Sequence, residues 1–511
     1  MPVQTSYPGV YVQEVPSGVR TIAGVSTSVA LFVGPTLWGP INEPVLCLNY
    51  TEFVRTFTDD TSQGDMARAV QLFFLNGGTQ CYIMRVAVIT GAASSTNPAS
   101  NASLTLNDAA AATTLSITAK YQGTLGNSIR AVVTNSVAGL GGKFDLELYR
   151  DVLGVKTDSQ TWTGLSMDPV LSITNARYAP DYVVYKWATL SPMPAAPLNT
   201  RAPANLVATS LAGGKNGNVV TATEYDAAYV IVDKEVDLFN LMVLPKNAGA
   251  TAVVQSALWS KASVFCQGRR AFLLMDPEAT WTTPQLAVAG MPTLRTGLVK
   301  NYSAVFYPNL TLNENGTNMQ IGPSGAIAGL MARIDASRGV WKAPAGTEAD
   351  LRGISGLEYR FSDGDNGFLN PRGVNTIRIF PNGIVNWGAR TMDGDDDFAS
   401  EYKYIPIRRT ALFIEESLYR GLKWVVFEPN DEPLWAQIRL NVGAFMHNLF
   451  RQGAFQGTKK QDAYFVKCDS ETTTQNDINL GIVNIWVGFA PLKPAEFVIL
   501  YLQQMTGQIQ V

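Results

Sequence analysis

The chain has 511 residues, of which 46% are hydrophobic and only 16% are charged, and its formal net charge is −3. A chain of this length is longer than a single hydrophobic core usually accommodates, which predicts two to four domains. The charged fraction is well below the roughly 25% that is usual for soluble proteins. The weakly acidic net charge excludes a globally basic nucleic-acid binder. The low charged fraction indicates that much of the surface is covered in an assembly, and the protein that assembles is either a structural protein or an oligomeric enzyme.

The four cysteines predict buried free thiols. They lie far apart and form no CxxC pair, so neither a zinc site nor a disulfide framework is indicated. The first residues lack the charged and apolar regions of a signal peptide, and no run approaches the about 18 apolar residues of a membrane span. We therefore expect a protein that folds in a cytoplasm, without a metal and without a membrane span.

Residues 1–20 are predicted to form an extended arm. Pro8 and Pro16 flank a strand-like stretch, and prolines at both ends disfavour a central strand but permit pairing at a sheet edge. The stretch either docks on another subunit or forms a local edge strand, and the sequence leaves both open. The residues expected to pair are Val10, Tyr11, Val12 and Val15.

Residues 21–90 predict the first part of an α/β core. Val29–Val33 is a buried strand, Asp65–Asn76 is a helix with Gly77 just after its end, and Cys81–Val88 is a second strand.

Residues 91–222 predict an inserted, β-rich domain made of short strands separated by Gly and Asn turns. The expected strands are Leu115–Ala119, Ile129–Thr134, Phe144–Tyr149 and Tyr182–Lys186. Its aromatic residues could stack on sugars, although packing in a core is the favoured interpretation. These residues are Trp162, Tyr178, Tyr182, Tyr185 and Trp187.

Residues 223–345 predict a middle α/β domain. The expected strands are Leu238–Leu244, Ala271–Met275 and Ser303–Tyr307, and the expected helices are Ala250–Phe265 and Ser324–Ala336. The last helix lies in the segment Gly322–Pro344, where Ser324 is a candidate N-cap and small residues permit close packing. The sequence does not decide whether those contacts lie within a subunit or between subunits.

Residues 346–490 predict a C-terminal α/β core, and residues 491–511 predict a second arm. The expected helices are Ile407–Arg420 and Asp431–Gln452, and the expected strands are Trp424–Phe427, Ala463–Val466, Ile482–Val487 and Glu496–Leu502. The last strand is apolar throughout, as in a strand covered on both faces. Its pairing residues are Phe497, Val498, Ile499, Leu500 and Tyr501.

The sequence contains no recognisable catalytic or cofactor site. His447 is the one histidine, which excludes a His-based triad and a multi-His metal site. Ser324 does not satisfy GxSxG, and the glycine-rich Gly213–Gly217 fits no nucleotide-binding motif. We therefore predict no enzymatic activity and no cofactor, so that any motion would draw on conformational free energy stored during assembly.

The acidic run Asp393–Asp397 offers alternating carboxylates but lacks the glycine and glutamate that an EF-hand requires. A solvated acidic loop is favoured over a calcium site.

Several motifs in the same order resemble the contractile tail sheath family of myovirus-type phages and related contractile injection systems. They are Tyr7–Val15, Phe73–Gly78, Tyr121–Arg130, Gly322–Pro344, Trp387–Thr391, Val426–Asn430 and Pro494–Val498. The resemblance thins over roughly residues 135–235. It implies a multidomain α/β fold whose discontinuous core is built from both ends of the chain, with the β domain inserted and the arms extended.

The resemblance also implies a function. Such subunits form a homo-oligomer of stacked rings around an inner tail tube protein, and we expect each ring to be a hexamer. The stack of rings lies between a baseplate and a tail terminator. The arms add strands to a neighbour's sheet, and contraction drives the tube through the target envelope. The expected location is the tail of a virion or an injection particle, assembled in the bacterial cytoplasm. The alternative is a static tail or baseplate component.

The resemblance assigns tube contact to the C-terminal core near the long helix and the loop after it. The candidate residues in this chain are Arg439, Arg451, Lys459 and Lys460. Contacts that must break during contraction are expected to be few and polar.

Overall fold

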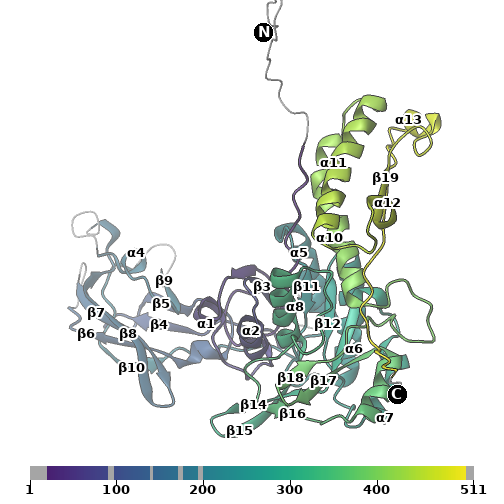
Figure 1. Cartoon of the computed structure of the whole chain (residues 1–511). Helices are drawn as coiled ribbons and strands as arrows, with labels where there is room; N and C mark the ends of the chain where they lie inside the picture. Colours follow the sequence, from purple (N-terminus) through teal and green to yellow (C-terminus); the bar gives the residue numbers. More distant parts are fainter. Residues whose placement is uncertain (1–19, 90–96, 138–141, 171–176, 194–198, 502–511) are drawn as a thin grey trace, which may run out of the picture. The chain divides into compact units, whose positions relative to one another are not determined.

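The computed structural model describes residues 20–89, 97–137, 142–170, 177–193 and 199–501 (Figure 1). These residues form two compact units. The larger unit is built from residues 28–334 and 344–403, and the smaller unit from residues up to 27, 335–343 and 404 onward. Both contain helices and strands, which confirms the predicted α/β class. Within the described ranges, no helix is both long and apolar enough to span a membrane.

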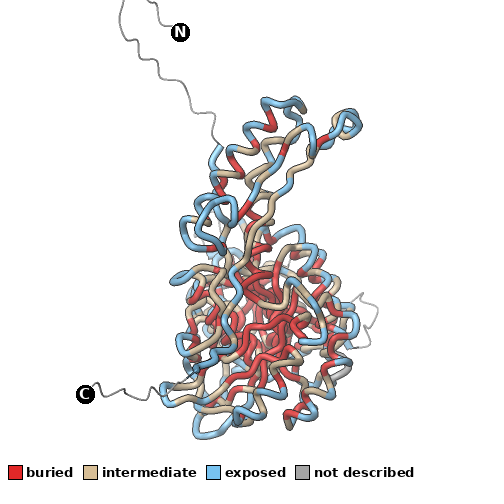
Figure 2. The backbone as a smooth tube through the Cα atoms, turned by 45° about the vertical axis from the view of Figure 1, so that its right-hand side comes forward, coloured by how far each residue is buried: buried red, intermediate tan, exposed pale blue. Residues whose placement is uncertain are grey.

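An eight-stranded sheet forms the centre of the larger unit, and buried residues concentrate in its strands (Figure 2). In spatial order its strands are β18 (Gly383–Asn386), β17 (Val374–Phe380), β13 (Ser303–Tyr307), β12 (Phe272–Met275), β11 (Leu241–Val243), β1 (Ala30–Gly34), β3 (Cys81–Arg85) and β2 (Pro44–Cys47). The strands from β17 to β3 run parallel, and β18 and β2 close the edges antiparallel. The five strands expected here are confirmed, whereas β2, β17 and β18 were not predicted.

Helices cover both faces of this sheet. Leu31 and Val33 of β1 point into a core shared with α5 (Ala222–Glu235), α6 (Ala252–Gly268) and α7 (Pro284–Leu294). Phe32 lies between them in sequence and meets the ring of Phe73 in α2 (Met66–Leu75), with centroids 5.5 Å apart. Because side chains alternate along a strand, β1 is buried on both faces, which explains its continuous apolar run. Two further helices are α1 (Tyr50–Phe57) and α9 (Asp363–Leu369).

The small residues of Gly322–Pro344 pack within the chain. A Cβ atom added at Gly329 of α8 (Ser324–Arg338) would lie 2.2 Å from the carbonyl oxygen of Phe73, and one at Gly325 would lie 2.5 Å from that of Ala69. Helix α8 therefore meets the backbone of α2 with no space for a side chain. This settles the question that the sequence left open for these glycines.

Helix α8 begins at Ser324, but Ser324 is not its N-cap, so that expectation was wrong. The carboxylate of Asp276, just after β12, accepts hydrogen bonds from Ser324 N at 2.8 Å and from Ser324 Oγ at 3.0 Å. A side chain from another element thus supplies the acceptor that the first turn of the helix requires.

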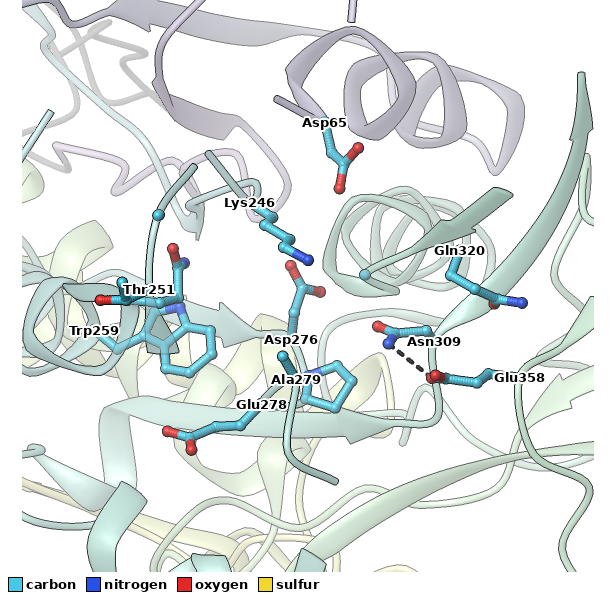
Figure 3. Close-up of a pocket in the computed structure, with 14 residues that line it drawn as sticks. Asp65, Lys246, Thr251, Trp259, Asp276, Glu278, Ala279, Asn309, Gln320 and Glu358 are labelled. Atoms are coloured by element: carbon cyan, nitrogen blue, oxygen red, sulfur yellow. Dashed lines mark hydrogen bonds between the residues drawn. The ribbon is translucent and has the colours of Figure 1, made fainter. Parts of the chain in front are cut away.

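We expect Asp276→Asn to stabilise the protein above neutral pH. Burial raises the pKa of the Asp276 carboxyl from 3.8 to about 6. The negative charge of Asp65, which lines the same pocket as Asp276 (Figure 3), raises this pKa further, whereas the hydrogen bonds from Ser324 lower it. The folded state therefore favours the protonated form, so wild-type stability falls as the pH rises through about 6. Asparagine retains an acceptor and never ionises. At pH 7.5 the free energy of unfolding should rise by about 1–3 kcal/mol, and at pH 4 the two proteins should match.

Urea unfolding at both pH values measures this effect. A variant less stable than wild type at pH 7.5 would show that the ionised carboxylate stabilises the start of α8.

Two small sheets share a second core in the larger unit. One contains β4 (Ser103–Asn107), β5 (Thr113–Ala119) and β9 (Ala188–Pro192), and the other contains β10 (Leu206–Ser210), β6 (Ile129–Thr134), β7 (Lys143–Val152) and β8 (Val155–Ser166). The strand expected at Tyr182–Lys186 was wrong, because a short helix, α4 (Ala179–Tyr182), ends there. Tyr185 and Trp187 are buried in this core, Trp162 packs against it and Tyr178 is buried as well, which supports packing over sugar stacking, whereas Tyr182 is 45% exposed. A third sheet contains β14 (Leu310–Glu314), β15 (Thr317–Ile321) and β16 (Gly356–Leu357).

The acidic run Asp393–Asp397 is an ion-pair network. Asp395 is only 2% exposed and pairs with Arg295 at 2.7 Å and with Arg372 at 3.3 Å, while Asp396 pairs with the buried Arg390 at 2.9 Å. The expectation of a solvated loop was therefore wrong for Asp395. Because arginines already neutralise these carboxylates, the network explains the acidic run without calcium.

The smaller unit contains α10 (Ile405–Gly421), α11 (Glu432–Arg451), α12 (Lys460–Ala463), β19 (Tyr464–Lys467), α13 (Gln475–Asn479) and β20 (Trp486–Phe489). Its core follows the predicted apolar stripe of α11, namely Leu434, Ile438, Val442, Phe445 and Leu449. The strand expected at Trp424–Phe427 was wrong, since Lys423–Val425 is a 3-10 turn. The strand expected at Ile482–Val487 begins only at Trp486.

Candidate assembly surface

The C-terminal segment of the smaller unit exposes a continuous run of large apolar side chains. Phe497 to Tyr501 are each between 74% and 88% exposed. The strand expected at Glu496–Leu502 is not formed within the chain, because none of its described residues pairs with another strand. Glu496 accepts a hydrogen bond from Tyr404 Oη at 3.1 Å, which ties the start of the segment to the start of α10. Five adjacent exposed side chains of this size indicate a surface that another chain covers.

A two-stranded antiparallel sheet, β19–β20, lies in the same unit. Tyr464 pairs with Phe489 and Val466 with Val487, and these four side chains pack against the core beneath α11. On the opposite face Phe465 is 51% exposed and Trp486 is 61% exposed. No third strand joins this sheet within the described part of the chain. Because a lone pair of strands is marginally stable and unpaired edges bind further strands, the sheet is suited to accept an arm.

The first described residues of the chain, which follow the N-terminal arm, are held on α10 and α11. Arg20 N donates to Asn441 Oδ1 at 3.2 Å, and the Arg20 guanidinium lies 4.6 Å from the centre of the Trp424 ring. Arg409 donates to the Thr27 carbonyl at 2.9 Å and forms an ion pair with Asp335 at 2.6 Å, in which both side chains are under 5% exposed. The predicted pairing residues Val10, Tyr11, Val12 and Val15 lie outside the described residues.

The turn between α10 and α11 presents an exposed aromatic side chain that the sequence analysis did not single out. Phe427 is fully exposed and has a φ of 71°, in the left-handed region that bulky residues rarely occupy. Val426 beside it is 63% exposed. The sequence signal was present in the motif Val426–Asn430, where apolar residues precede Pro429, but a strand was predicted there instead. Backbone strain that displays an apolar ring indicates a contact site.

The four residues predicted to face a tube occupy different environments. Arg439 forms an ion pair with Glu432 at 2.5 Å and donates to the Cys468 carbonyl, so its charge is engaged within the subunit. Arg451, Lys459 and Lys460 are exposed near the C-terminal end of α11, and Lys460 lies 5.6 Å from the centre of the Tyr464 ring. Arg439 and Arg451 are separated by about 18 Å along the helix axis. The structure therefore groups three of the four residues.

The unit offers little for acid–base chemistry. His447 is exposed on α11, and its ring centre lies 6.1 Å from that of Phe450. Burial raises the pKa of the Cys468 thiol to about 11, so the thiol is protonated and unreactive at neutral pH. No cluster of histidine, cysteine or acidic side chains suited to a metal ion occurs among the described residues.

Comparison with known proteins gives consistent matches. Residues 218–392 match the family described as phage tail sheath protein central domain, and residues 397–504 match the phage tail sheath C-terminal domain, together more than half of the chain. A prophage major tail sheath protein of Pseudomonas aeruginosa is 28% identical over 37% of this chain and 48% of its own length. A tail sheath protein of Vibrio phage KVP40 is 23% identical over 56% of this chain and 45% of its own length. The aligned parts thus span about half of each relative.

Solved structures share the fold over nearly the whole chain. The sheath of the extracellular contractile injection system PVC, in its contracted state, has a TM-score of 0.59 and 22% identity, covering 98% of this chain and 99% of its own. The contracted helical sheath of the anti-feeding prophage has a TM-score of 0.58 and 24% identity over the same shares. A sheath tail protein of Desulfitobacterium hafniense has a TM-score of 0.61 and 14% identity, covering 90% and 93%.

Proposed function

Because the chain belongs to the phage tail sheath protein family, which includes contractile injection system sheaths, we propose that it polymerises around an inner tube. The assembled sheath is held in an extended, metastable state. On triggering it contracts and drives the tube through the target cell envelope. A free-energy difference of about 1–2 kcal/mol per subunit, summed over many identical copies, is sufficient for a one-way motion.

The exposed run Phe497–Tyr501 is the observation that carries this proposal. We propose that it adds a strand to the open β19–β20 sheet of a neighbouring subunit, and that Val10, Tyr11, Val12 and Val15 pair in the same way. Backbone hydrogen bonds at about 1 kcal/mol each, together with burial of the apolar run, hold the arms in place. Gly and Pro residues flank the N-terminal arm, and a hydrogen bond from Tyr404 to Glu496 ties the C-terminal segment to the start of α10 just before the exposed run, so we propose that subunits rotate while remaining linked.

The further partners follow from this assembly. One similar chain comes from the baseplate of the anti-feeding prophage, symmetrised six-fold, and we propose hexameric rings here, with the inner tube, a baseplate and a tail terminator as partners. The particle, a virion tail or an injection system, assembles in the bacterial cytoplasm. We place the C-terminal core, residues 346–490, nearest the tube and the inserted domain, residues 91–222, outside.

Tube contact is proposed for the exposed cations at the C-terminal end of α11. Arg451, Lys459 and Lys460 have exposed charges. Arg439 forms an ion pair with Glu432, and this ion pair must break before Arg439 can contact the tube. Exposed charge pairs are weak and reversible, which suits a contact that must break during contraction.

Electron microscopy of the purified protein tests the function. Sheath subunits should form wide, hollow tubes with a cogwheel cross-section. A smooth, narrow tube would contradict the sheath function and would favour the alternative, a static tail or baseplate component.

A further inference from the structure

Two of the four cysteines stand directly opposite each other on neighbouring strands of the central sheet. Cys47 is the last residue of β2 and Cys81 is the first residue of β3, and the antiparallel register pairs them. Both are free thiols, and they are 1% and 0% exposed. The other two lie elsewhere: Cys266 is on α6 beside Met242, and Cys468 belongs to the smaller unit. Assembly through the arms, as proposed above, gives the opposed pair no role.

The spacing of β2 and β3 suits a disulfide between the two cysteines. Opposed residues of an antiparallel pair project from the same face of the sheet and have Cα atoms about 4.5–5.5 Å apart. A disulfide bridges Cα separations of about 4.4–6.8 Å, so the register holds both sulfur atoms within reach of one bond. The spacing of the cysteines in the sequence did not indicate this bond, because only the pairing of the strands brings together residues from either side of α1 and α2.

The closed sheet protects both thiols. Burial, followed by the negative charge of Glu52, raises the pKa of the Cys47 thiol to about 12. Burial also raises the pKa of the Cys81 thiol well above its ordinary value, and the charge of Cys47 raises it further, which reflects the proximity of the two sulfur atoms. Because the thiolate is the form that reacts, both cysteines stay inert at neutral pH while they are covered.

Strand β2 supplies the access that an oxidant needs. It has four residues, ends the eight-stranded sheet, and pairs only with β3 among the described residues. Its first residue, Pro44, has no N–H to donate, and Leu46 and Leu48 on either side of Cys47 are 43% and 54% exposed. Short edge elements with exposed neighbours open locally more often than central strands do. Opening of β2 uncovers Cys47, whereas β3 stays paired with β1.

We propose that Cys47 and Cys81 are a redox modification site, at which a small-molecule disulfide such as oxidised glutathione converts the two thiols into a cross-strand disulfide. When β2 opens, the Cys47 thiol loses its proton to water and attacks one sulfur of the small disulfide, which forms a mixed disulfide and releases one glutathione that takes up a proton. When β2 returns, the Cys81 thiol loses its proton and attacks the Cys47 sulfur, which displaces the second glutathione. Two electrons thus pass from the cysteine pair to the small disulfide, which ends as two thiols.

The bond joins the edge strand covalently to the sheet. It also closes the segment between the two cysteines, which contains α1 and α2, into a loop, and α2 packs directly against α8. Oxidation therefore stabilises the larger unit by restricting its unfolded chain. Under the proposed function, the subunit folds in a reducing cytoplasm and meets oxidants after the particle is released, but the site itself does not rest on that function.

Oxidation of the full-length, unassembled protein with oxidised glutathione at pH 8.0 tests the site. We expect two of the four thiols to be lost, the intact mass to fall by two hydrogen atoms, and a digest to contain one linked pair of peptides, that of Cys47 with Cys81. The melting temperature should rise by about 3–6 °C, and dithiothreitol should reverse both changes. Four free thiols after prolonged oxidation, a linkage that includes Cys266 or Cys468, or an unchanged melting temperature would overturn the proposal.

Single substitutions determine the order of attack. Cys81→Ala removes the second thiol of the pair, so one glutathione should remain attached to Cys47. Cys47→Ala should leave Cys81 as a free thiol, because β1 and β2 still flank it. Cys266→Ala, which removes a buried thiol of the same unit, is the matched control and should oxidise as the wild type does. Glutathione on Cys81 of the Cys47→Ala protein, with none on Cys47 of the Cys81→Ala protein, would contradict entry through β2.

Discussion

A chain that ends at Glu496 should fold normally and fail to assemble. Removing residues 497–511 deletes the exposed apolar run but keeps the Glu496–Tyr404 hydrogen bond and every side chain of the core beneath α11. The thermal unfolding temperature should therefore stay within a few degrees of wild type. The lost burial of five large side chains should weaken each subunit junction by an amount on the order of 5 kcal/mol, enough to abolish tubes at micromolar protein. Sedimentation and electron microscopy measure the assembly.

Point substitutions provide the matched control for this truncation. Phe497→Asp combined with Ile499→Asp should also prevent tube formation, because a charge cannot be buried at the junction without a large cost. Val230→Asp makes the same exchange at an exposed position of α5 and should leave assembly intact. Deleting residues 1–16 should likewise give a folded monomer. Normal tubes from either truncated chain would contradict strand addition by that arm.

Gly329→Ala should destabilise the larger unit by about 2–4 kcal/mol. The new Cβ would lie 2.2 Å from the carbonyl oxygen of Phe73, far inside the contact distance, and the neighbour is backbone that cannot rotate away. Helix α8 must then separate from α2, which loosens the packing around Phe73 and Phe32. Denaturant unfolding followed by tryptophan fluorescence measures the change, since Trp259 and Trp281 both lie in the core of this unit.

Gly367→Ala is the matched control for this substitution. Gly367 lies within α9 of the same unit, and a Cβ added there meets nothing within 4 Å. Because alanine favours a helix more than glycine does, this variant should gain up to about 1 kcal/mol. If the two substitutions changed stability equally, the close contact of α8 with α2 would not be the cause.

Sequence patterns predicted much of the fold where the signal was local. The strands Ile129–Thr134 and Ser303–Tyr307 were predicted with the bounds that the structure has, since β-rich runs bounded by turn residues are read directly from neighbouring positions. The stripe along α11 was equally clear, because apolar residues recur with the helical period. Glycines and prolines located the ends of these elements.

Elements that depend on distant partners were missed. Strand β17 contains Asn375 and Thr376, whose polarity argues against a buried strand until Asn375 Nδ2 is seen to donate to the carbonyls of Val305 and Arg390. Asp395 seemed solvated because its partners Arg295 and Arg372 lie 100 and 23 residues away. Phe427 was predicted to lie in a strand, whereas the structure places it in a turn with a left-handed backbone and a fully exposed side chain.

The sequence by itself determined the α/β class, the family resemblance and the apolar character of the C-terminal segment, because all three follow from residue type and local order. Only the tertiary structure decided which apolar residues are covered. Phe497–Tyr501 and β13 are similarly apolar, yet β13 is buried between β12 and β17 whereas no part of the described chain covers Phe497–Tyr501. Burial depends on contacts between distant segments, and a sequence pattern indicates that a strand needs a partner without identifying the partner.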